Sequence, residues 1–279
     1  MSNLQLLKTL PNVQNVAANS TATIGVPVGV KSYEHIGLEQ GGTTFTKAQV
    51  TNLEVLLNGS PIHQYATAVH LELISAYYGY DVNSDEIIVP FKRSYLTKDS
   101  EAERFNIGVA DVATAQIQTD ITGATAPTMA AFDRETIVRA ANDDNATVVK
   151  KNRLGLFAKV KKFTHSLVGS GVTEIDNIPR EAFLMALHMI QSSDVITKVE
   201  VWLDNQLVWD GSKTRMTNEV NRAGRAKQSN CYHVDFLLAN ELGGQLVLQG
   251  SQDFRLKVSH SGACDLTTYV EYQTSFSGF

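Results

Sequence analysis

The sequence predicts an all-β protein built as a double jelly roll, that is, two tandem eight-stranded jelly-roll β-sandwiches with a short helix inserted in each. Segments of about six residues that alternate apolar and polar side chains recur along the 279 residues, as in strands with one buried face. Turn residues that tolerate positive φ follow such segments at Asn58-Gly59 and Asp204-Asn205. The second half of the chain also repeats the order of segments in the first half, which indicates a duplicated domain.

The repeat is clearest between residues 50–59 and residues 196–205, each an alternating strand that ends in a turn. Thr, Glu, Val and Leu recur at matching positions of the two segments. The alternative is that β proteins in general look alike at this level, but further pairs in the same order favour duplication. These pairs are residues 24–27 with 175–179, 33–38 with 183–190, 105–109 with 254–258, and 115–121 with 266–272.

The predicted helices follow the two strand–turn repeats. Residues 65–74 have apolar side chains at three- and four-residue spacing, which predicts an amphipathic helix. The corresponding residues 213–227 are more polar, with Met216, Val220 and Ala223 as their apolar stripe.

We therefore expect a first jelly roll with an N-terminal arm over residues 1–125, a linker over residues 126–153 and a second jelly roll over residues 154–279. The linker combines small residues, proline and a polar run, and we expect one short helix in it at residues 134–141.

The composition limits the classes of protein to which the chain can belong. With 43% hydrophobic and 19% charged residues, the 30.5 kDa chain can bury a sizeable core without disulfides. The net charge of −5 argues against nucleic-acid binding over the whole surface. Cys231 and Cys264 form neither a metal-binding spacing nor a disulfide framework, so we expect free thiols in a protein made in a reducing cytoplasm. No signal peptide and no membrane-spanning segment is expected.

Motifs of catalysis do not fit the sequence. Residues 25–32 resemble a phosphate-binding loop, but Val30 separates the glycine from the lysine and Pro27 removes a backbone donor. Residues 169–171 (GSG) lack the flanking pattern of a nucleophile elbow. The histidines have no zinc-binding spacing, and we expect those in predicted strands to be structural: His63, His188 and His233. We expect no enzyme and no required cofactor.

A calcium site is a weaker candidate. Residues 81–85 (DVNSD) begin like a calcium loop, but Glu86 replaces the required glycine and Lys92 stands where a bidentate glutamate is needed. This excludes an EF-hand and leaves open a looser structural calcium site. Its candidate ligands are Asp81, Asn83, Asp85, Asp143 and Asp144.

One cluster of positive charges stands out in this acidic chain. It has two interpretations: a solvated strand edge protected by lysines, or a surface that meets lipid headgroups or an acidic partner. Its members are Lys150, Lys151, Arg153, Lys159, Lys161 and Lys162.

Several segments resemble the corticovirus-type major capsid proteins of tailless, membrane-containing phages. The resemblance covers nearly the whole chain in the same order and is weakest over residues 124–166. The matching segments are residues 10–13 (LPNV), 50–59, 173–180 (TEIDNIPR), 234–236 (VDF), 254–258 (FRLKV) and the terminal Gly278-Phe279.

The resemblance implies a structural virion protein without catalytic residues. It implies homotrimers that form pseudo-hexagonal capsomers, and an icosahedral capsid around an internal membrane, supported by calcium. Expected partners are further copies of the chain, neighbouring capsomers, a penton protein, and viral membrane proteins or lipid, but no sequence-specific nucleic acid. The N-terminal arm, with Leu4, Leu6, Leu7 and Leu10, is expected to pack beneath its own trimer or a neighbour.

Two other functions suit a two-domain jelly-roll protein. A glycan amidase would need acidic and aromatic residues that converge in a cleft. A carbohydrate-binding protein would expose a planar aromatic set, for which Tyr77, Tyr78 and Tyr80 are the best candidates because Trp202 and Trp209 lie near predicted core strands.

Overall fold

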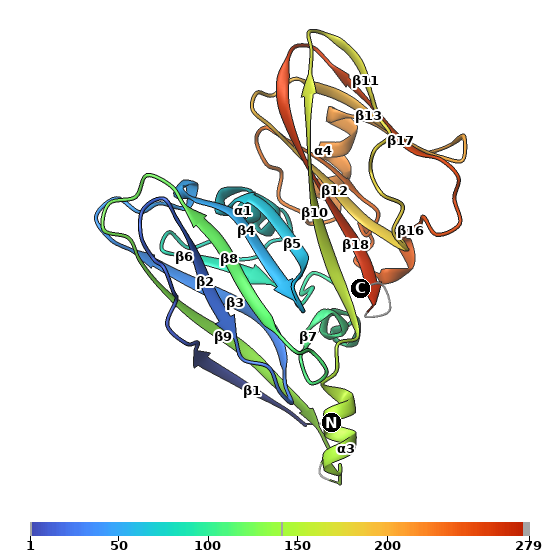
Figure 1. Cartoon of the computed structure of the whole chain (residues 1–279). Coiled ribbons are helices and arrows are strands. Elements are labelled where there is room, and N and C mark those ends of the chain that lie inside the picture. Colours follow the sequence, from blue (N-terminus) through green and yellow to red (C-terminus); the bar gives the residue numbers. More distant parts are fainter. Residues whose placement is uncertain (1, 141, 276–279) are drawn as a thin grey trace. The chain divides into compact units, whose positions relative to one another are not determined.

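The computed structural model describes residues 2–140 and 142–275, and the chain divides into two compact units (Figure 1). Of the described residues, unit 1 holds 2–76, 80–140, 142–158 and 275. Unit 2 holds Tyr77–Gly79 and Lys159–Thr274. The terminal Gly278-Phe279 of the capsid-protein resemblance lies outside the described residues.

Unit 1 is a sandwich of two antiparallel sheets. One sheet has the order β2-β8-β4-β5, made of β2 (Ser20–Val26), β8 (Ala115–Ile121), β4 (Val50–Leu57) and β5 (Ser60–Thr67). The other has the order β1-β9-β3-β6 with β7 also paired to β3, made of β1 (Ser2–Thr9), β9 (Thr128–Arg139), β3 (Ser32–Gly41), β6 (Glu86–Pro90) and β7 (Ile107–Gly108).

Unit 2 repeats this construction. One sheet has the order β15-β12-β18-β10 with β16 also paired to β12, made of β15 (Cys231–Asp235), β12 (Phe183–Gln191), β18 (Cys264–Ser275), β10 (Leu156–Leu167) and β16 (Leu246–Val247). The other has the order β11-β17-β13-β14, made of β11 (Gly171–Ile175), β17 (Phe254–His260), β13 (Ile196–Leu203) and β14 (Gln206–Ser212). The predicted tandem double jelly roll is confirmed.

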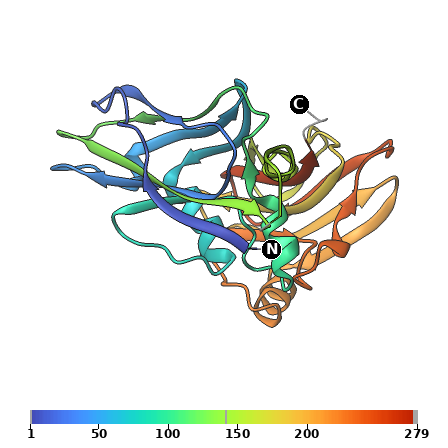
Figure 2. The same cartoon turned by 90° about the horizontal axis from the view of Figure 1, so that it is seen from below.

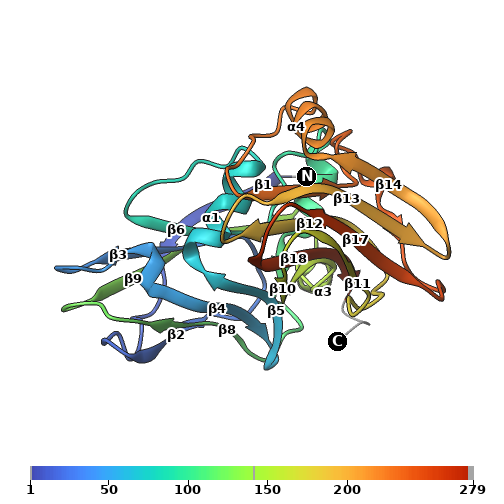
Figure 3. The same ribbon diagram turned by 90° about the horizontal axis from the view of Figure 1, so that it is seen from above.

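The two predicted helices are present as α1 (Ala68–Tyr77) and α4 (Lys213–Arg222), each directly after a β-hairpin. The Ser212 side chain caps α4 by accepting a hydrogen bond from the Arg215 amide, and Met216 and Val220 are its buried residues. This polar helix packs on β13, β14 and β15 (Figure 3). The remaining helical segments are short: η1 (Lys47–Gln49), α2 (Asp99–Ala102), η2 (Glu103–Phe105), α3 (Asn145–Lys151) and η3 (Leu242–Gly244).

The core consists of the side chains that alternate along the strands. In β8 the buried residues are Ala115, Ile117, Thr119 and Ile121, and the residues between them are partly exposed. In β17 the buried residues are Phe254, Leu256, Val258 and His260. Full burial of each large apolar side chain contributes about 1.5–3 kcal/mol, so this period of two is the main source of folding free energy.

The expected helix at residues 134–141 is wrong, because residues 128–139 form β9 in the middle of a sheet. The inward-facing residues of this strand include Asp133 and Glu135, whereas Phe132 faces the other side and is only half-buried. Buried acidic side chains reverse the polar pattern that identifies a strand in sequence, which is why the strand was missed. The segment expected as a linker therefore contains β9 and α3.

The N-terminal arm, whose packing beneath a trimer stays a prediction, begins with a strand. Residues 2–9 form β1, which pairs in continuous antiparallel register with β9, from Ser2 opposite Arg139 to Thr9 opposite Phe132 (Figure 2). The arm is thus a strand of unit 1. A further difference lies at residues 105–109, where only Ile107–Gly108 is a strand because η2 occupies the preceding residues. In the described part of the chain, no helix is long and apolar enough to cross a membrane.

The glycine of β7 provides a test of local packing. A Cβ on Gly108 would lie 2.2 Å from the carbonyl oxygen of Arg153, whereas a Cβ on Gly155 would meet nothing within 4 Å. We expect Gly108→Ala to lower the free energy of unfolding by about 1–3 kcal/mol because the backbone must move apart. The control Gly155→Ala should stay within about 0.5 kcal/mol of the wild type. Urea denaturation of the full chain measures both; equal midpoints for the two variants would contradict the packing described.

Candidate functional site

The predicted basic cluster is divided between the two units. Lys150 and Lys151 end α3 and Arg153 follows it, all in unit 1, whereas the other three lysines lie on β10 in unit 2. Three of the six charges have carboxylate partners. Lys151 Nζ lies 2.6 Å from Asp143 Oδ2, and Lys159 Nζ and Lys161 Nζ lie 3.1 and 2.5 Å from Glu181 Oε1.

Within unit 1, Lys150 and Arg153 are exposed, and neither forms an ion pair with any residue of the described ranges. These two side chains are therefore the members of the cluster whose charge is available to a partner.

Three of the five calcium candidates already have protein partners: Asn83, Asp143 and Asp144. The Asn83 carbonyl accepts a hydrogen bond from Lys47 Nζ, and the Asn83 side chain donates to Glu86. Asp144 caps α3 by accepting from the Thr147 amide at 2.7 Å. Hydrogen bonds from Lys151 and from the Ala140 amide lower the pKa of Asp143.

Asp81 and Asp85 lie in the exposed loop between α1 and β6. No group of three or more His, Cys, Asp or Glu side chains is placed to hold a metal ion in the part of the chain that the structure describes. Calcium binding stays a prediction.

The densest group of ionisable side chains is in the core of unit 2, and we call it the Asp235 network. All its members are buried: Tyr77, Tyr78, His188, Arg225, His233, Asp235 and Glu271. Asp235 Oδ2 accepts hydrogen bonds from Tyr77 at 3.0 Å and from Arg225 Nε at 3.3 Å, and its other oxygen accepts from the Leu237 amide at 2.7 Å. Burial raises the pKa of Asp235, and the Arg225 guanidinium opposes that rise.

Two histidines continue the network. His188 Nδ1 lies 2.8 Å from His233 Nδ1, so one of these nitrogens donates to the other. Tyr78 donates to Glu271 at 3.0 Å and lies 3.2 Å from His188 Nε2. Burial, and then the neighbouring His188, lowers the pKa of His233 well below its usual value. Because every member of the network is buried, we attribute to it a role in ordering the core.

A second buried charge group lies in unit 1 at the edge of the sheet that contains β1. Glu135 is paired with Lys8 and, at 2.7 Å, with Lys31 Nζ. Burial raises the pKa of the neighbouring Asp133 to about 6, with a further rise from Glu135. For Glu135, hydrogen bonds from Lys31 and Lys8 outweigh burial and lower the pKa. The Lys8–Glu135 pair ties β1 to β9.

The expectation of structural histidines is confirmed. His63 Nε2 lies 3.0 Å from the Ala158 carbonyl oxygen, and burial lowers the pKa of His63 to about 3. Cys231 and Cys264 are free and buried, and burial raises the pKa of Cys231 to about 12. Neither thiol is suited to nucleophilic chemistry, because the reactive species is the thiolate.

Arg225, Asp235 and Glu271 were not expected as members of a site. For Asp235 the sequence carries a signal, because it is the acidic residue that ends the otherwise uncharged segment CYHVD. The structure shows that all five residues of this segment, which forms β15, are buried. The tyrosines suggested for carbohydrate binding are not a surface platform. Tyr77 and Tyr78 are buried, and Tyr80 donates to the Lys92 carbonyl at 2.7 Å.

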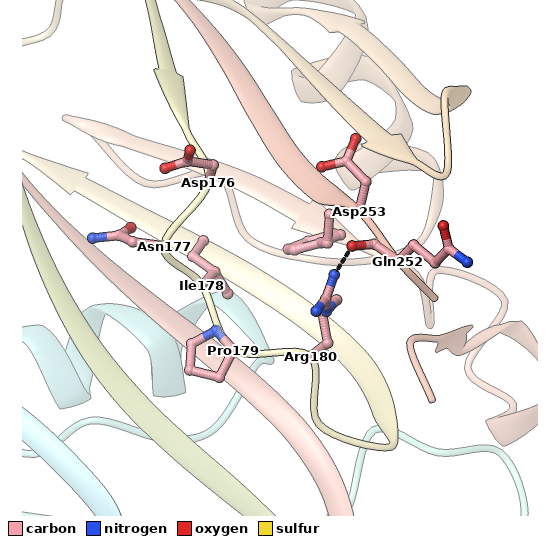
Figure 4. Close-up of a pocket in the computed structure, with 8 residues that line it drawn as sticks. Asp176, Asn177, Ile178, Pro179, Arg180, Gln252 and Asp253 are labelled. Carbon is pink, nitrogen blue, oxygen red and sulfur yellow. Dashed lines mark hydrogen bonds between the residues drawn. The ribbon is translucent and has the colours of Figure 1, made fainter. Parts of the chain in front are cut away.

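A surface hollow of about 430 Å³ lies between two loops of unit 2 (Figure 4). The Arg180 guanidinium donates to the Gln252 carbonyl, and Asp204 Oδ1 accepts from the Gln252 and Asp253 amides at 2.7 and 2.9 Å. These bonds fix the two loops to each other. The lining contains two carboxylates and no histidine or cysteine: Asp176, Asn177, Ile178, Pro179, Arg180, Gln252, Asp253 and Phe254.

Two jelly rolls in one chain are the architecture of the double jelly-roll capsid proteins. Solved structures of such proteins have the same fold as this chain. The crystal structure of the major capsid protein P2 from bacteriophage PM2 matches with a TM-score of 0.86 at 24% identity, over 98% of each chain. The STIV major capsid protein matches with a TM-score of 0.68 at 11% identity, over 97% of this chain and 96% of that one. The PBCV-1 virus capsid matches with a TM-score of 0.66 at 10% identity, over 98% and 94%.

Two family models identify the protein family to which the chain belongs. The model of the viral coat protein P2 N-terminal domain matches residues 7–134, and that of the P2 C-terminal domain matches residues 157–275. The chain belongs to the viral coat protein P2 family and is a viral major capsid protein, a component of the virion. Among curated protein sequences, none matches this chain. The carbohydrate-binding and amidase alternatives are not favoured.

The Arg225–Asp235 pair gives a prediction with a matched control three residues away. Arg225→Ala leaves the Asp235 carboxylate buried with two neutral donors, so we expect the free energy of unfolding to fall by about 3–5 kcal/mol. Arg222→Ala removes an exposed pair with Glu219 and should change it by less than about 1 kcal/mol. Urea titrations of both variants decide the matter, and similar small losses would show that the buried pair is unimportant.

His233 predicts a loss of stability in acid. Because its pKa is lowered in the folded chain, only the unfolded chain takes up a proton at this residue as the pH falls below about 6.5, and stability then decreases. We expect the decrease in unfolding free energy between pH 7 and pH 5 to be smaller in His233→Gln, since this variant lacks one group that takes up a proton only in the unfolded chain. Urea midpoints at several pH values measure this. An unchanged pH dependence would mean that His233 binds a proton in the folded state as well.

Proposed function

We propose that three copies of this chain form a homotrimeric, pseudo-hexagonal capsomer, and that such capsomers tile an icosahedral capsid around an internal membrane. The observation that carries the proposal is the duplication, since each chain supplies two sandwiches of similar construction. A closed threefold ring of such chains presents six similar units, which suits a sixfold lattice position. Membership of a coat-protein family supports self-association.

The partners that follow are neighbouring capsomers, a penton protein, and viral membrane proteins or lipid on the inner face. Synthesis in the host cytoplasm agrees with the free, buried thiols of Cys231 and Cys264. The net charge of −5 speaks against sequence-specific nucleic acid as a partner. We infer a purely structural protein without enzymatic activity and without a required cofactor. The burial of His188, His233, Tyr77 and Tyr78 supports the inference that these side chains do not act on a substrate.

Two surface features suit contacts in such a shell. Lys150 and Arg153 carry exposed positive charge suited to anionic lipid or an acidic partner. Asp81 and Asp85, in an exposed loop, offer carboxylates that a structural calcium ion could bridge between neighbouring copies.

The oligomeric state tests the proposal. We expect size-exclusion chromatography with light scattering to give a particle of about three times 30.5 kDa, because one chain supplies only two of six units. A clean monomer over the accessible concentration range would reject the capsomer. A repeat with a calcium chelator tests the ion separately: a trimer that persists unchanged shows that calcium does not hold the trimer together.

A further inference from the structure

A small basic pocket lies in unit 1 beside the C-terminal end of α3. Its volume is about 150 Å³, and it lies among residues from the start of β3, the η2 segment, the end of β9 and the stretch that follows α3. The polar side chains that line it are Ser32, Glu103, Arg104, Asn106, Lys151 and Arg153.

The charges of this pocket are unbalanced. Arg104 and Arg153 form no ion pair with any residue in the described ranges 2–140 and 142–275. Lys151 is paired with Asp143, and the single acid of the lining, Glu103, lies 3.7 Å from Lys92. Two guanidinium groups therefore face one small volume without a counter-ion from the protein.

The backbone that carries the lining residues Lys151 and Arg153 is fixed because Asn152, which lies between them and is fully buried, ties several segments together. Its Oδ1 accepts from the Val138 amide at 3.2 Å and from Ser32 Oγ at 3.4 Å, and its Nδ2 donates to the carbonyls of Val138 and Val148 at 3.2 and 2.8 Å. The Asn152 carbonyl accepts from the Ala110 amide at 3.1 Å.

Arg153 is held on both sides. Gly108 packs directly against its carbonyl group, and the next residue, Leu154, donates its amide to Asp111 at 2.8 Å. The guanidinium of Arg153 thus extends from a fixed backbone, which reduces the entropy lost when it binds a ligand.

The end of α3 does not repel an anion as a free helix C-terminus would. The Val148 carbonyl accepts from the Asn152 side chain, and the Val149 and Lys150 carbonyls accept from the Asn152 and Arg153 amides. The oxygen atoms that carry the negative end of the helix dipole are therefore already hydrogen-bonded within the chain.

Asn106 adds a polar group without a use in the fold. Its side-chain Oδ1 is buried and has no hydrogen-bond partner among the described residues. A carboxamide presents either its oxygen or its two N–H donors after a half-turn about its last torsion, so Asn106 can donate to a bound oxyanion.

We propose that this pocket binds a phosphate group, with the guanidinium groups of Arg104 and Arg153 as the main ligands and Lys151 and Asn106 as further donors. Planar guanidinium forks match the oxygen pairs of a tetrahedral oxyanion. A single carboxylate has only two oxygens for these four groups. The volume corresponds to roughly five water molecules, which admits a phosphate group. The phosphate belongs to a free phosphate ion or to a lipid headgroup that enters from the exposed side.

The site lies within one unit of one chain, so it does not depend on the proposed capsomer. A trimer without phosphate binding, or phosphate binding by a monomer, would separate the two proposals.

The first test titrates the full-length chain with inorganic phosphate at low ionic strength in a calorimeter. We expect Arg104→Gln and Arg153→Gln each to weaken binding about tenfold or more, since each loses a charged hydrogen bond. The control is Arg222→Gln, which removes an exposed positive charge of α4 that does not line the pocket, and it should change affinity less than about twofold. Unfolding midpoints confirm that all variants are folded.

The second test identifies the source of the phosphate. Flotation with vesicles of phosphatidylglycerol and phosphatidylcholine is compared with pure phosphatidylcholine. Retention by the anionic vesicles that Arg153→Gln abolishes and Arg222→Gln preserves assigns a lipid headgroup. Binding of inorganic phosphate without vesicle retention assigns the free ion. The proposal is overturned if the wild type binds neither ligand, or if Arg222→Gln weakens binding as much as Arg104→Gln and Arg153→Gln do.

Discussion

In each unit, two antiparallel sheets share one apolar interior, and the side chains that fill it are those at every second position of the strands. This constraint determines where the rest of the chain can go. Helices α1 and α4 lie outside the strands as insertions after hairpins, and α4 needs only Met216 and Val220 to attach to the sheet. Charged side chains that fall inside the sandwich must find a partner there, because an unpaired buried charge would cost more than the burial of several apolar groups contributes.

Such partners are found in both units. In unit 1 the carboxylate of Glu135 meets two lysines, and in unit 2 that of Asp235 meets one arginine and a tyrosine. Buried ion pairs add little net stability compared with apolar residues of the same volume, but they penalise other pairings strongly. In the observed register of β1 and β9, Lys8 lies opposite Asp133 and its ammonium group pairs with Glu135. A protein that must present the same surfaces in many copies benefits from such specificity.

The chemistry of the molecule agrees with a shell component. His63, His233, Cys231 and Cys264 are buried, and burial suppresses their ionisation, whereas the unpaired charges of Arg104 and Arg153 lie at the surface of unit 1. These two arginines line a small pocket next to the C-terminal end of α3. The buried Asp235 network thus orders the fold. The unpaired charges of Arg104 and Arg153 are available to a ligand.

The sequence by itself determined the duplicated all-β architecture, the positions of strands such as β8 and β13, and the two inserted helices, because alternation, turn residues and the internal repeat are local in the chain. It did not determine β9, whose inward residues Asp133 and Glu135 are acidic, or the pairing of β1 with it. It also treated six basic residues as one cluster, although they belong to two units and three are neutralised. Only tertiary structure decides such matters, since the partner that makes a buried charge tolerable, or leaves a surface charge free, lies far away in the sequence.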